Sequence, residues 1–183
     1  MLLKQNNEYI HSIQNYVQAF EKNSFRHIAS NDFSKWPSPL EETWRLSRLG
    51  KLTRKKIEPI HSDFKKNIRI KAKIKNAICL SFVDGAYRED LSDELPVGIT
   101  LHQLNEKECL SFLSKIKKTN LANHPSTNSS LSCTPSIIKI NVDAHFSSNR
   151  LIEIIYSGGM DNKSVHPVLY IELKKSSNLS IVE

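Results

Sequence analysis

Apolar residues recur at helical spacing near the start of the chain. Ile10, Ile13, Val17 and Phe20 lie three or four residues apart, which places them on one face of a helix. The first thirty residues are therefore predicted to be helical. We expect this helix to dock onto other parts of the protein, because an isolated helix of this length is marginal in water.

Two further elements are predicted before the middle of the chain. Ser38 and Pro39 provide a capping residue and a first helical residue, and Gly50 suits the end of that helix. Residues 68–75 alternate between apolar and basic side chains. A period of two predicts a strand with one charged face, at a sheet edge or facing solvent.

The middle of the chain has the clearest pattern. The run Ala77–Val83 is typical of a strand, the pair Asp84–Gly85 of a two-residue hairpin turn, and Ala86–Arg88 of the returning strand. A short strand is predicted at Ile99–Leu101. A helix is expected after the capping residue Asn105. Its apolar face comprises Cys109, Leu110, Phe112, Leu113 and Ile116.

The pattern changes after residue 121. Residues 121–136 are rich in Asn, Ser, Thr and Pro and are predicted to form a flexible, exposed linker. Every later apolar run is typical of a strand. The predicted strands are Ile137–Val142, Leu151–Tyr156, Val168–Leu173 and Leu179–Val182. We therefore expect an α+β chain with a boundary near Cys133. The open edge of the last strands, from Leu151 to Val182, should require a continuation or a partner.

Charge adds one feature to this picture. The formal net charge is +7, but the segment Arg45–Lys75 alone holds twelve basic and two acidic residues. Such a segment could bind nucleic acid through phosphate contacts, and a basic nucleic-acid-binding module is the alternative function. No helix-turn-helix, RNA-recognition or zinc-finger pattern accompanies it. The sequence therefore favours a solvated face or an acidic protein partner.

No complete catalytic or metal site is evident in the sequence. Cys79, Cys109 and Cys133 are odd in number and widely spaced, so reduced, partly buried thiols are expected rather than a disulfide framework. Of seven scattered histidines, His145 and His166 could become neighbours on stacked strands, which leaves a metal pair conceivable. Exposed or core histidines are the favoured interpretation. We predict no catalytic, cofactor-binding or metal-ligating residue and no enzymatic activity.

The sequence also bears on location. No apolar run approaches the length of a membrane helix, and the first ten residues lack the apolar segment of a secretory signal. We therefore expect a cytoplasmic protein without a membrane partner. A plastid-type organelle is the other location that this pattern allows.

Three segments together resemble the SufB/SufD family of iron–sulfur cluster assembly proteins. Pro39–Leu49 resembles a tryptophan-containing stretch near the start of SufD-type proteins. Leu80–Tyr87, with Leu91–Asp93 and Leu95–Ile99, resembles a more specific family motif of strand, turn and loop. Pro167–Ile171, with the final residues 177–183, resembles a stretch early in the family's β-helix.

The resemblance implies a fold and a role. It implies a helical and mixed N-terminal domain with amphipathic helices and a β-hairpin over residues 1–133. The first strands of a right-handed parallel β-helix would follow over residues 134–183. It also implies that this chain is the non-catalytic N-terminal part of a scaffold subunit, which assembles through the β-helix with a SufB-like paralogue and a SufC-like ATPase. Iron–sulfur clusters would be handled by the complex and not bound by this chain. The family's chains are longer, and their cluster-assembly residues and ATPase-docking helices have no counterpart here.

Overall fold

Contacts within the chain divide it into two units, each assembled from three separate segments. The computed structural model describes residues 7–30, 55–60, 70, 72–158 and 161–183. The helical unit comprises Met1–Ile60, Glu106–Cys133 and Gly159–His166. The sheet unit comprises His61–Asn105, Thr134–Gly158 and Pro167–Glu183. The chain is thus a mixed α+β protein. This grouping differs from the predicted division into residues 1–133 and 134–183, because strands on both sides of residue 133 share the same sheets.

The helical unit begins with the predicted amphipathic helix. Helix α1 spans Glu8–Val17, and the Asn7 side chain caps it by accepting a hydrogen bond from the Ile10 N–H at 3.1 Å. Its apolar face is buried as predicted, with Ile13 and Val17 almost inaccessible. The helix ends earlier than expected, and Phe20 lies in the turn before helix α2, Phe25–Ser30.

Two further helices belong to the described part of the helical unit. Helix α4, Glu106–Ile116, confirms the predicted helix. The 3₁₀ helix η4, Asn120–Asn123, then leads into helix α5, Pro125–Cys133. The prediction of a flexible, exposed linker over residues 121–136 is therefore wrong.

Helix α5 was not predicted because small polar residues make up much of its buried face, beside Leu131 and Cys133. Ser129 and Ser132 are buried, and Ser132 Oγ donates a hydrogen bond to the Asn128 carbonyl at 2.7 Å. A serine that bonds within its own helix can enter a helix interface without leaving an unsatisfied hydroxyl. The small side chains let α5 pack against α1 and α2.

The helical unit also contains a short pair of strands. Strands β1, Glu58–Pro59, and β7, Lys163–Ser164, pair in parallel. Lys163 Nζ lies 2.7 Å from Glu58 Oε2, so an ion pair joins the same two strands.

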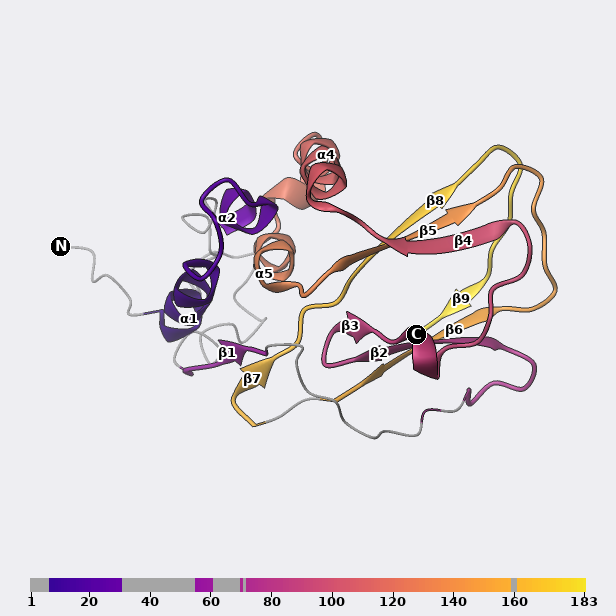
Figure 1. Cartoon of the computed structure of the whole chain (residues 1–183), viewed down its shortest axis with the longest axis horizontal. Helices are drawn as coiled ribbons and strands as arrows, with labels where there is room; N and C mark the ends of the chain where they lie inside the picture. The colour runs from indigo at the N-terminus through magenta and orange to yellow at the C-terminus, as the bar shows by residue number, and fades with distance from the viewer. Residues whose placement is uncertain (1–6, 31–54, 61–69, 71, 159–160) are drawn as a thin grey trace, which may run out of the picture. The chain divides into compact units, whose positions relative to one another are not determined.

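The sheet unit contains two sheets, which Figure 1 shows as two layers. The first has the order β3-β2-β6-β9, formed by Ala86–Tyr87, Ile78–Val83, Ile152–Ser157 and Ile181–Val182. The second has the order β4-β5-β8, formed by Ile99–Gln103, Ile137–Val142 and Val168–Leu173. The strands predicted in these regions are therefore present.

The predicted hairpin is confirmed. Strands β2 and β3 pair antiparallel, with Phe82 aligned with Tyr87. The turn residues Asp84 and Gly85 have φ angles of 50° and 88°, as a two-residue hairpin turn requires.

The prediction of a strand at residues 68–75 is wrong for the part that the structure describes. Residues 73–76 form a bend and a turn, with Asn76 at a φ angle of 63°. The amides of Lys73 and Ile74 donate hydrogen bonds to Glu153 Oε2 at 2.8 and 3.0 Å. Glu153 is buried, so these amides satisfy its carboxylate instead of joining a sheet. The helix predicted from Ser38 to Gly50 lies outside the described residues.

The strands after residue 134 repeat a pattern. The chain passes from β5 in one sheet to β6 in the other, and then from β8 to β9 in the same order. β8 lies parallel to β5, with Ile137 aligned with Val168. β9 lies parallel to β6, with Ile152 aligned with Ile181. One pass through both sheets is thus stacked in parallel on the previous pass, and we call each pass a rung.

The main apolar core fills the space between the two sheets. Its members are the buried residues Ile78, Leu80, Phe82, Ile99, Ile138, Ile140, Val142, Ile152 and Ile154. Leu169, Ile171 and Ile181 from the second rung pack against this cluster. Both rungs therefore share one core. None of the described helices has the length and apolar character needed to cross a membrane.

Candidate functional site

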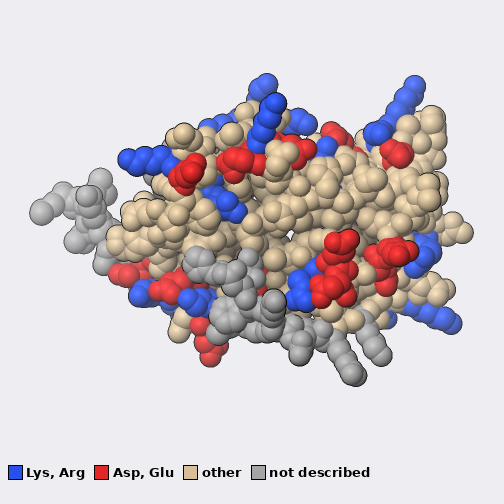
Figure 2. Space-filling model, in the orientation of Figure 1, with Lys and Arg blue, Asp and Glu red and all other residues tan. Residues whose placement is uncertain are grey.

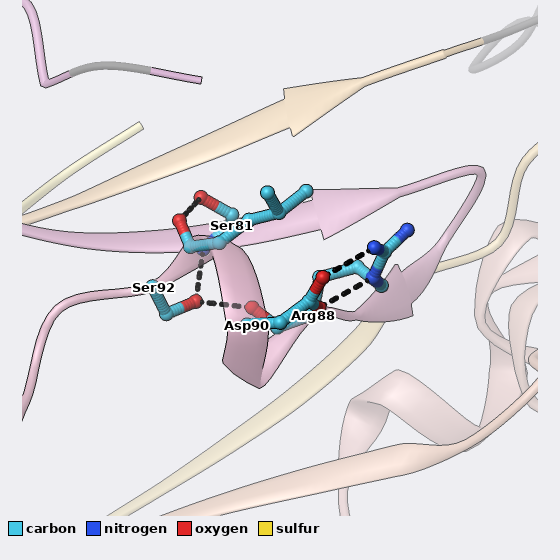
Figure 3. A network of polar contacts seen from close by, with 5 residues as sticks. Ser81, Arg88, Asp90 and Ser92 are labelled. Carbon is cyan, nitrogen blue, oxygen red and sulfur yellow. Dashed lines mark hydrogen bonds and ion pairs between the residues drawn. The ribbon is translucent and has the colours of Figure 1, made fainter. Parts of the chain in front are cut away.

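A polar network ties strand β2 to the segment that follows the hairpin (Figure 3). Ser81 donates its N–H to Ser92 Oγ at 2.9 Å and its hydroxyl to the Leu91 carbonyl at 2.7 Å. Ser92 Oγ donates in turn to the Arg88 carbonyl at 2.7 Å. These bonds hold the 3₁₀ helix η3, Glu89–Leu91, beside the sheet.

The same segment is joined to β2 at a second point. The Cys79 N–H donates to Asp93 Oδ2, and the Asp93 N–H donates to the Cys79 carbonyl, each at 2.8 Å. Arg88 and Asp90 form a bidentate ion pair on the exposed side. Within this pair, the pKa of the Asp90 carboxyl is lowered by its hydrogen bonds from Arg88. Residues 88–93 thus follow β2 as an irregular edge, bonded partly through side chains.

The residues of the motif that carries the family resemblance have structural roles. The Phe82 and Tyr87 rings lie 5.7 Å apart across the hairpin, and Leu95 packs against the core. Gly98 has a φ angle of 98°, and a Cβ there would lie 2.7 Å from Phe146 Cδ2. Each of these residues shapes the fold.

An open groove of about 940 Å³ lies between strand β4 and residues 87–95. Tyr87, Leu95 and Leu101 contribute apolar surface to it, and Glu89 and Glu94 contribute carboxylates. Figure 2 shows acidic side chains gathered on this face in the region of η3. The sequence patterns assigned no role to this acidic stretch. The sequence EDLSDE shows that acidic residues are dense in this segment, but not that they line a groove with β4.

Asp84 and Gly158 approach each other closely beside the hairpin turn. Asp84 is only 2% exposed, and its N–H donates to the Ser157 carbonyl at 2.9 Å. Gly158 has a φ angle of 114°, and a Cβ at this position would overlap the Asp84 carboxylate. The turn therefore depends on a glycine at position 158.

The three cysteines are thiols and not disulfide partners, as predicted, and all three are buried. Burial raises the pKa of the Cys133 thiol to about 12, and burial together with Glu106 raises that of Cys109 to about 11. The thiolate is the reactive form of cysteine. Neither Cys109 nor Cys133 therefore has the environment of a nucleophile.

His145 and His166 are not brought together. His145 is exposed and follows β5, whereas His166 is buried and precedes β8. Because β5 and β8 run parallel, the two histidines flank opposite ends of this strand pair. The His166 ring instead lies 2.8 Å from Ser164 Oγ, and burial lowers its pKa to about 4. Among the described residues, no group of three or more His, Cys, Asp or Glu is placed to hold a metal ion.

Most of the basic segment Arg45–Lys75 lies outside the described residues, so nucleic-acid binding stays a prediction. The chain matches no protein-family model and no curated protein.

Proposed function

We propose that this chain is a non-catalytic scaffold subunit of an iron–sulfur cluster assembly complex of the SufBCD type. The proposal combines the sequence resemblance to SufD-type proteins with one structural observation. That observation is the stacking of β8 on β5 and of β9 on β6, each in parallel register.

Parallel stacking of successive rungs is how solenoid proteins grow, because each repeat contacts mainly its neighbours. The rung of β8 and β9 repeats the rung of β5 and β6 after about thirty residues. This arrangement supports a β-helix that begins near residue 134, as the resemblance implies. In the proposal the β-helix is right-handed and adds further turns or a partner beyond β8 and β9.

The proposed role is architectural. Its partners are a SufB-like paralogue and a SufC-like ATPase, with cluster chemistry carried by the complex and not by this chain. The structural tasks of residues 79–98 agree with this role, because the most specific part of the resemblance serves the fold. The proposed location is the cytoplasm or a plastid-type organelle.

The test is co-expression of the tagged chain with SufB-type and SufC-type subunits from the same genome. The proposal predicts that both partners co-elute with the tagged chain in a fixed ratio after affinity and size-exclusion chromatography. Failure of either subunit to co-elute, with all three proteins folded and soluble, would contradict it.

A pair of variants tests whether the open strand edge is used. Leu173 is 53% exposed at the end of β8. The Lys174 N–H donates to the Val142 carbonyl, so the parallel ladder turns the Leu173 amide away from β5. Leu173→Pro removes this amide, whereas Leu173→Ala keeps it. We expect the proline variant to weaken co-elution and the alanine variant to leave it unchanged.

A further inference from the structure

Strand β4 has an edge that no strand of the described residues occupies. It is the first strand in the order β4-β5-β8, so only one side of it is paired. The Asp143 N–H donates to the Gly98 carbonyl, and the Leu104 N–H donates to the Ile137 carbonyl. These two bonds fix which residues of β4 face β5.

Residues in an antiparallel ladder alternate between the two sides of a strand. Because Gly98 and Leu104 bond toward β5, Thr100 and His102 do so as well, opposite Asn141 and Lys139. The backbone N–H and C=O groups of Leu101 and Gln103 therefore point to the other side. That side opens into the groove, which both residues line.

The wall opposite this edge combines apolar and acidic surface. Tyr87 and Leu95 are half-buried and pack against the core, and they contribute its apolar part. The exposed side chains of Glu89, Asp93 and Glu94 stand beside them. The Asp93 carboxylate also accepts a hydrogen bond from the Cys79 N–H. The described structure shows no comparable hydrogen bond from the sheet to the carboxylates of Glu89 and Glu94.

We propose that this groove binds an extended, basic segment of a protein partner, which adds to β4 as a further strand. Unpaired backbone groups on an edge strand give such a segment its main-chain hydrogen bonds. Alternate side chains of the added strand would face Tyr87 and Leu95. Lysine and arginine fit these positions, because their stems pack on apolar surface while their charged ends reach the carboxylates.

Charge complementarity selects this occupant over others. A nucleic acid would meet the carboxylates with its own phosphates, and an acidic peptide would be repelled in the same way. A purely apolar strand would leave Glu89 and Glu94 beside an uncharged surface. The proposal stands independently of the scaffold role, because it uses a different edge from that of β8 and β9.

The test is the binding of a fluorescently labelled nine-residue peptide with lysine at every second position and threonine between. Fluorescence anisotropy should show saturable binding to the intact protein. A peptide with glutamate in place of lysine should not bind. Absence of saturable binding by the lysine peptide would overturn the proposal.

Two sets of protein variants separate strand addition from general charge attraction. The double variant Glu89→Lys, Glu94→Lys should weaken binding by about tenfold or more. The variant Glu21→Lys, Asp161→Lys makes the same change in net charge at exposed positions outside the groove and should stay within about twofold. Equal weakening by both double variants would overturn the proposed site.

The backbone contribution is tested at Gln103, whose side chain is exposed. Gln103→Pro removes the amide that faces the groove and should weaken binding by about tenfold, whereas Gln103→Ala should have little effect. If the proline variant fails to fold, hydrogen exchange of the unmodified protein replaces it. The Leu101 and Gln103 amides should then gain protection when the peptide binds, and unchanged exchange at both would overturn the strand-addition mode.

Discussion

A single methyl group added at Gly158 should destabilise the fold through a local clash. Its φ angle of 114° is strained for any other residue, and a Cβ would overlap the Asp84 carboxylate. We expect Gly158→Ala to lower the free energy of unfolding by about 2–4 kcal/mol, measured by denaturant unfolding.

The clash can be separated from the backbone strain by a second substitution. Asp84→Gly removes the carboxylate and tolerates the φ angle of 50° at that position. Gly158→Ala should therefore cost less in the Asp84→Gly background, because only the backbone strain remains. Equal costs in both backgrounds would show that Asp84 is not the obstacle.

His166 should make stability depend on pH. Burial lowers its pKa from 6.5 to about 4 in the folded protein. Between these values the unfolded chain binds more protons, so stability falls as the pH drops from about 6.5 toward 4 and is unaffected by this group above 6.5. The full shift corresponds to about 3 kcal/mol. Unfolding measured across this range should show a flatter pH dependence for His166→Gln, and an unchanged slope would contradict the assignment.

At the scale of elements, helix α5 is held by small side chains. Ser132 is 0% exposed where α5 packs against α1 and α2. We expect Ser132→Leu to lower the unfolding free energy by about 1–3 kcal/mol, because the added carbons have no space in a close-packed interface. Ser126→Leu, at an exposed position of the same helix, should change it by less than about 0.5 kcal/mol in the same thermal or denaturant assay. Similar costs at the two positions would contradict the close packing of α5.

Sequence patterns predicted the elements that bury large apolar side chains. The helix with Ile13 and Val17 and the strand Ile78–Val83 have such side chains at the right period. Helix α5 has fewer of them, because serine and asparagine make up much of its buried face beside Leu131 and Cys133. The alternation of apolar and basic residues at 68–75 wrongly predicted a strand, because the pattern does not show which distant residue the backbone will contact. The described part of that segment bonds to Glu153, a partner far away in the sequence.

The candidate groove was not predictable for a related reason. Leu101 on β4 and Glu94 after η3 come together only when the two sheets form around a shared core. The alternation of Ile99, Leu101 and Gln103 predicts a strand, but it does not tell which edge of that strand will stay open. The pairing of β4 with β5 decides this.

At the scale of the whole molecule, the order of strands matters more than any single side chain. Segments of the chain before and after α5 contribute to the same two sheets. β2 pairs with β6 and β4 pairs with β5, so these two strands flank the first rung. The second rung, β8 and β9, then stacks on the first. The scaffold proposal depends on this stacking.

The most direct test of the two-rung arrangement is amide hydrogen exchange along β8, measured residue by residue by NMR. The Lys174 N–H bonds to Val142, so the parallel ladder places the amides of Tyr170 and Glu172 on the same, paired side. We expect slow exchange at Tyr170 and Glu172 and fast exchange at Leu169 and Ile171, which face the open edge. Uniform exchange along β8, or the opposite alternation, would contradict the stacked rungs and with them the observation that supports the scaffold role.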